Sequence, residues 1–76
     1  MGYEFLNQKK NLIAIAIFKF NVSAYPKSSN VYDSLGEAYM NNGDKQLAIL
    51  NYKKSLELNT DNNNAKEALK KLNEVK

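Results

Sequence analysis

The chain has 76 residues, with eleven lysines, eight acids and a net charge of +3. Because it contains neither cysteine nor histidine, it lacks disulfides, thiolates and the imidazoles that most often act as general bases or metal ligands. The lysines are scattered among the acids and arginine is absent, which favours a solvated surface over nucleic-acid binding. We therefore expect no catalysis, no cofactor, no metal ion and no nucleic-acid partner.

The first two predicted helices cover residues 2–8 and 11–24, with a turn at residues 8–11. This turn contains neither glycine nor aspartate, so we expect it to be loose, with Asn11 capping the following helix one residue late. The second helix holds the longest apolar run, LIAIAIF at residues 12–18. A membrane-spanning helix needs about 20 such residues, so the run predicts a buried helix. With no membrane segment and no targeting signal, the default expectation is a cytoplasmic protein.

One side of the 11–24 helix is apolar where polar residues are expected. Gln46, Asn51 and Lys54, on a later helix, should face solvent. The residues 34 positions before them are Leu12, Ile17 and Phe20. We expect these three to form an exposed apolar interface, because no other segment of the chain is left to cover them. The partner would be a second copy in a two-fold dimer, or a larger domain of which the chain is a fragment.

Residues 29–42 and 45–58 predict an antiparallel pair of helices joined by Asn42-Gly43-Asp44. Glycine allows the positive φ of a tight turn, and Asp44 is placed to cap the second helix, as Ser28 or Ser29 is for the first. Gly36 and Ala48 are small and let the two helices approach closely. The space around that contact is filled by Tyr39, Tyr52 and Leu56.

The last predicted helix covers residues 63–75, with Asn62 as its N-cap. One side of this helix is apolar and the other carries lysines, which is typical of a helix that closes a repeat array. The residues expected to face inward are Ala65, Ala68, Leu69 and Leu72.

The chain is similar to itself at a shift of 34 residues, which is the period of a helix–turn–helix solenoid. The aligned pairs include Gly2 with Gly36, Phe5 with Tyr39, Ala14 with Ala48, Ile15 with Ile49, Phe18 with Tyr52 and Val22 with Leu56. Residues Leu35-Gly36, Tyr39, Gly43, Ala48, Tyr52 and Leu56 resemble the tetratricopeptide repeat signature. Pro26 stands where a preceding repeat should end, whereas Thr60 replaces the proline usual at the end of the next.

The resemblance implies one all-α, antiparallel helix–turn–helix solenoid of about five helices. It would consist of a truncated first repeat (1–28), a full repeat (29–62) and a capping helix (63–76). In this family the first helix of each repeat lines a groove that binds peptides. The groove residues implied here are Tyr3, Leu6, Asn7, Asn30, Asp33, Glu37, Met40 and Asn41, with Lys71 on the last helix.

The acids of this groove restrict its ligand. Asp33 and Glu37 would repel the C-terminal carboxylate that the best-known groove of the family binds, so a basic or neutral segment is expected. The two acids share a helix face, but two ligands are too few for a hard metal ion. The leading hypothesis is a non-catalytic protein–protein interaction module that binds a protein or peptide through the short groove and the 11–24 helix.

An alternative comes from a second resemblance. The stretch FKFNVSAYPKSSNVYDSLGEAYMNNGDKQLAILNYKKSLELN is similar to the C-terminal repeat tail of some bacterial serine hydrolases of the β-lactamase and penicillin-binding-protein-like class. It implies an accessory C-terminal domain of a larger bacterial hydrolase, with the catalytic residues upstream of this chain.

Overall fold

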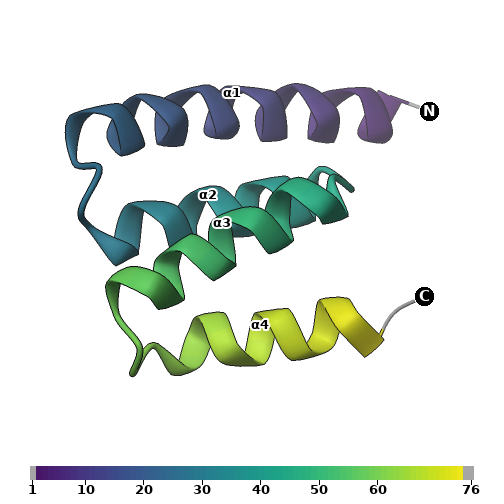
Figure 1. The fold of residues 1–76 in the computed structure, drawn as a ribbon. Helices are drawn as coiled ribbons and strands as arrows, with labels where there is room; N and C mark the ends of the chain where they lie inside the picture. Colours follow the sequence, from purple (N-terminus) through teal and green to yellow (C-terminus); the bar gives the residue numbers. More distant parts are fainter. Residues whose placement is uncertain (1, 75–76) are drawn as a thin grey trace.

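Four helices follow one another in the computed structural model, which describes the backbone of residues 2–74 and the side-chain environments of residues 9–73. They are α1 (Gly2–Ala24), α2 (Ser29–Asn41), α3 (Lys45–Leu58) and α4 (Asn63–Glu74). Each helix packs against the next, so that α1 and α4 flank the α2–α3 pair (Figure 1). The described residues contain no strand, and the predicted all-α class is confirmed. None of these four helices is long and apolar enough to cross a membrane.

The expectation of about five helices is wrong, because α1 runs from Gly2 to Ala24 without the turn predicted at residues 8–11. Gln8, Lys9 and Lys10 all have good helix propensity, and none of them favours the positive φ that ends a helix. Extending a helix adds one hydrogen bond for each residue fixed. The predicted helices over 2–8 and 11–24 are therefore a single element.

The turn between α2 and α3 forms as predicted. Gly43 has a φ of 84°, a conformation that costs little only without a Cβ. The N–H of Gly43 donates to the Met40 carbonyl at 3.1 Å, and the N–H of Asp44 donates to the Tyr39 carbonyl at 2.8 Å. This is the Schellman arrangement at a helix C-terminus. It reverses the chain and lays α3 against α2.

The helix caps were predicted with mixed success. Asn62 Oδ1 accepts a hydrogen bond from the N–H of Ala65 at 3.2 Å, as expected of an N-cap. Ser28 and Asp44 occupy N-cap positions, but neither side chain makes a capping hydrogen bond. Asp44 Oδ2 instead accepts from Asn42 Nδ2 at 2.9 Å, within the turn.

Asn11 also has a different role from the predicted cap. It lies inside α1, and its Nδ2 donates to the carbonyl of Asn41 at 3.1 Å. Asn41 ends α2, and the last carbonyls of a helix have no partner within it. Asn11 therefore satisfies the C-terminal end of α2 and joins it to α1.

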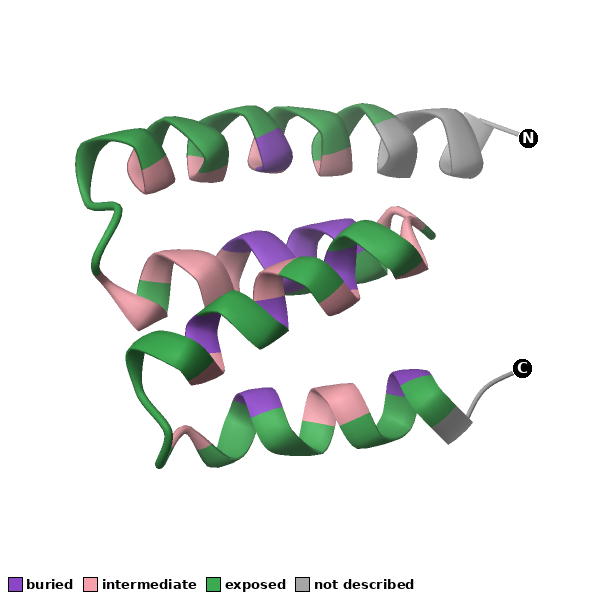
Figure 2. Ribbon diagram, viewed as in Figure 1, coloured by how far each residue is buried: buried purple, intermediate pink, exposed green. Residues whose placement is uncertain are grey.

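The core lies along α2 and the sides of its neighbours that face it (Figure 2). A Cβ on Gly36 would lie 3.1 Å from the ring of Tyr52, so the missing side chain lets this ring pack directly on the α2 backbone. Ala48 is fully buried, and the predicted close contact of α2 and α3 is confirmed. On α4, Ala65 and Leu72 are buried, and Ala68 and Leu69 pack against the core as predicted.

Candidate functional site

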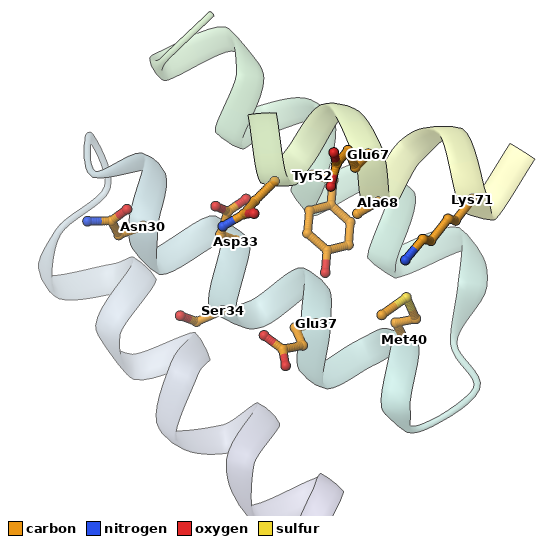
Figure 3. A pocket seen from close by; sticks show the side chains of 10 residues that line it. Asn30, Asp33, Ser34, Glu37, Met40, Tyr52, Glu67, Ala68 and Lys71 are labelled. Atoms are coloured by element: carbon orange, nitrogen blue, oxygen red, sulfur yellow. The ribbon is translucent and has the colours of Figure 1, made fainter. Parts of the chain in front are cut away.

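A hollow of about 490 Å³ lies between α2 and α4. The side chains of the two helices face each other across it, and the ring of Tyr52 from α3 lies between them (Figure 3). From α2 the hollow is lined by Asn30, Asp33, Ser34, Glu37 and Met40, and from α4 by Asn64, Glu67, Ala68 and Lys71.

Most of the predicted groove residues with described side chains meet in this hollow. They are Asn30, Asp33, Glu37, Met40 and Lys71. Asn41 instead lines a neighbouring hollow of about 160 Å³ between α1 and α2. Ser34 and Glu37 line both hollows, so the two lie side by side along α2. Tyr3, Leu6 and Asn7 lie outside the residues whose side chains the structure describes.

A polar network at the N-terminal ends of α2 and α4 holds one wall of the larger hollow. Asn62 Nδ2 donates to Asp33 Oδ2 at 2.7 Å and to Ser55 Oγ at 2.9 Å. Ser55 Oγ donates in turn to the carbonyl of Ser29 at 3.0 Å. Ser55 is fully buried, and a buried hydroxyl with both functions satisfied is stable. The network ties α2, α3 and the start of α4 together and fixes the Asp33 carboxylate.

One oxygen of this carboxylate has no donor. Asp33 Oδ1 is buried without a hydrogen-bond partner, whereas Oδ2 accepts from Asn62. A buried acceptor without a donor raises the free energy of the folded state. Asp33 Oδ1 can therefore still accept a hydrogen bond, because no donor among the described residues is bonded to it.

The hollow is acidic although the chain as a whole is basic. Asp33, Glu37 and Glu67 place three carboxylates around it against the single ammonium of Lys71, while the net charge of the chain is +3. Burial, with the added effect of the Glu37 and Asp33 charges, raises the pKa of Tyr52 to about 12. The raised pKa of Tyr52 shows that the hollow disfavours additional negative charge.

Tyr52 was predicted only as a core residue, and Asn64, Glu67 and Ser55 were not predicted as part of this site. A signal for Ser55 does exist, because it is a polar residue on the inward side of α3, three positions after Tyr52. A serine at such a position predicts a buried hydrogen bond. Its partner Asn62 was predicted, but only as a cap.

The second predicted surface lies on α1, away from α2 (Figure 2). Leu12, Ile17 and Phe20 have 57%, 55% and 73% of their surface exposed, and Ile13 between them has 51%. With Ala16, which is also exposed, they lie on one side of the helix at the spacing i, i+1, i+4, i+5, i+8. We refer to Leu12, Ile13, Ala16, Ile17 and Phe20 as the α1 stripe.

The described residues contain no group of three or more acids, histidines or cysteines that could hold a metal ion. Comparison with family models, curated proteins and solved structures finds no match to the chain. The functional assignment therefore depends on the two surfaces themselves.

Proposed function

We propose that the chain is a protein-binding module of tetratricopeptide type, and that the hollow between α2 and α4 binds a peptide segment bearing lysine or arginine. The observation that carries this proposal is the charge of the hollow. Three carboxylates and one ammonium line it, in a chain whose net charge is +3. A cation is attracted to this place although the chain as a whole carries a net positive charge.

The dimensions of the hollow suit one or two side chains of a peptide. Its volume of about 490 Å³ lies within the roughly 300–1,000 Å³ of typical ligand sites. Met40 and Ala68 supply apolar surface beside the acids, against which the methylene stem of a lysine can pack while its ammonium meets a carboxylate. The hollow thus offers both parts of the surface that a long basic side chain needs.

The walls are also held in place before binding. Asn62 bonds Asp33 and Ser55 at once, and the buried Tyr52 ring packs against Gly36 on α2. A wall that is already ordered lowers the entropy lost on binding. Binding of this kind involves no bond making or breaking, and the proposal assigns no catalytic residue.

The test is a titration with two labelled decapeptides, one alternating lysine with glycine and one alternating glutamate with glycine, followed by fluorescence anisotropy. We expect the lysine peptide alone to bind, and its affinity to fall as salt is raised, because exposed charge pairs are screened. Glu37→Gln should weaken binding by a factor of about 1.4 to 5, since an exposed ion pair contributes roughly 0.2–1 kcal/mol.

Glu57→Gln is the matched control, because Glu57 is an exposed acid on α3 outside the hollow, 3.5 Å from Lys54. It removes the same charge and should leave binding unchanged. Equal binding of the two peptides, or equal effects of the two substitutions, would assign the attraction to overall charge and contradict the proposed site.

A further inference from the structure

The outward side of α1 differs from the outward side of α3 in its residue types, and not in how far neighbouring helices cover it. The matching positions of α3, which packs against both α2 and α4, are also turned outward. They hold Gln46, Leu47, Leu50, Asn51 and Lys54. These positions thus face outward even in the helix with two neighbours, and there three of the five are polar. In α1 all five are apolar.

We propose that the α1 stripe binds the α1 stripe of a second copy of this chain, with the two helices antiparallel. The arrangement of side chains supports a pairing of the stripe with itself. In an antiparallel pair centred between Ala16 and Ile17, each Ala16 faces the partner's Ile17 and each Phe20 faces the partner's Ile13. A small residue thus meets a large one at the centre, as close packing of two helices requires.

The charges select the antiparallel orientation. Residues 9–24 of α1 contain no acid and three lysines, which are Lys9, Lys10 and Lys19. Lys19 lies close to the centre of the stripe, so Lys9 and Lys10 distinguish the two orientations most strongly. A parallel pair would place these lysines side by side. In the antiparallel pair the two Lys9 residues lie about 22 Å apart along the axis, because fifteen residues rise about 1.5 Å each. That distance exceeds the screening length of about 8 Å in physiological salt.

The area of the stripe predicts a reversible dimer. Each of its four large side chains exposes more than half of its surface, which amounts to about 400 Å², given that a whole aromatic side chain buries roughly 150–250 Å². Two stripes would bury about 800 Å², below the roughly 1,200 Å² at which stable interfaces begin. We therefore expect a weak dimer whose population rises with the concentration of the chain.

The first measurement is the mass of the chain in solution by sedimentation equilibrium, from about 10 μM to 1 mM. The mass should rise from 8.6 kDa toward twice that value. Phe20→Lys should keep the chain monomeric at every concentration. Leu50→Lys is the control, because Leu50 on α3 is 63% exposed but lies outside the stripe, and this variant should still dimerise. Circular dichroism verifies that both variants remain helical.

Cysteine cross-linking then tests the orientation, because the chain has no cysteine of its own. Ala16→Cys lies near the two-fold axis and should form a disulfide-linked dimer under mild oxidation, whereas Lys9→Cys should not. The proposal is overturned by preferential cross-linking at position 9, or by a dimer that Phe20→Lys leaves intact. A chain that stays monomeric also overturns it, and co-sedimentation of that monomer with phosphatidylserine vesicles would assign the stripe to a lipid surface instead.

Discussion

Residues 11–24 of α1 lie 34 positions before the residues of α3, but α1 packs against one helix and α3 against two. Their inward residues correspond, with Ala14 matching Ala48 and Phe18 matching Tyr52. Ala48 and Tyr52 are buried, whereas Ala14 and Phe18 are only partly buried and line the smaller hollow. The same inward pattern thus gives a closed core in one place and an open surface in the other, because burial depends on what the neighbours cover.

The outward sides of the two helices differ in the opposite way. Neither is covered, yet α1 carries an uninterrupted apolar stripe and α3 interrupts its leucines with polar residues. The inward residues of the two helices therefore differ in burial because their neighbours cover them to different extents. The outward residues differ in polarity because the residue types differ. The two effects can be separated by substitutions at matched positions.

The largest effect is expected from pH, at the position where α1 has Phe18 and α3 has Tyr52. The pKa of Tyr52 is raised to about 12 in the folded chain, against about 10 when unfolded. The folded state therefore holds the phenolic proton more tightly, so its full stability is present below pH 10 and is lost as pH rises from 10 through 12. Two pKa units correspond to about 2–3 kcal/mol of unfolding free energy, measured by urea denaturation at a series of pH values.

Tyr52→Phe gives α3 the residue type that α1 has at this position and supplies the control. The variant keeps every other ionisable residue of the chain. It should lose most of the alkaline destabilisation. If wild type and variant lose stability equally between pH 10 and 12, the burial of the Tyr52 phenol does not cause the loss.

The next effect compares two alanines. Ala48→Leu should lower the unfolding free energy by about 1–3 kcal/mol, because the three added carbon atoms cannot fit into a fully buried contact without moving the helices. Ala14→Leu makes the same change where the side chain borders a hollow, and should cost less than about 1 kcal/mol. Urea denaturation of both variants gives the comparison, and equal losses would show that α1 is as closely covered as α3.

The fold was predictable where single residues impose a backbone geometry or a periodicity. Gly43 predicted the turn at which its φ of 84° is found, and the spacing in α4 predicted the burial of Ala65 and Leu72. The missing turn in α1 was not predictable from the repeat, because a period says where a turn would fall and not whether turn residues are present. The helix propensity of Gln8, Lys9 and Lys10 was better evidence for a continuous helix than the period was for a turn.

The candidate site was predicted on α2 and incompletely elsewhere. Asn30, Asp33 and Glu37 were implied by the resemblance to the repeat family, and all three line the hollow. Glu67 and Tyr52 line the hollow because α4 and α3 bring them next to α2. Contacts of this kind between helices cannot be predicted from the periodicity of a single helix. The orphan Oδ1 of Asp33 likewise depends on the positions of several helices at once.

The smallest effect on stability is expected from giving α3 the outward residues of α1 by the triple substitution Gln46→Leu, Asn51→Ile and Lys54→Phe. The changes remove an exposed hydrogen bond from Asn51 to the Leu47 carbonyl and an exposed Lys54–Glu57 ion pair. Such contacts contribute little, so the unfolding free energy should change by less than about 0.5 kcal/mol.

Association should nevertheless change, because each chain would then carry two apolar faces. Leu47 and Leu50 already lie between the substituted positions, so the triple variant completes a second stripe. Two separate self-binding faces on one chain link copies without closing at a pair, and sedimentation should show masses beyond twice 8.6 kDa. A triple variant that stops at the wild-type mass would mean that apolar composition is not enough, and that the stripe depends on the longer helix that only α1 provides.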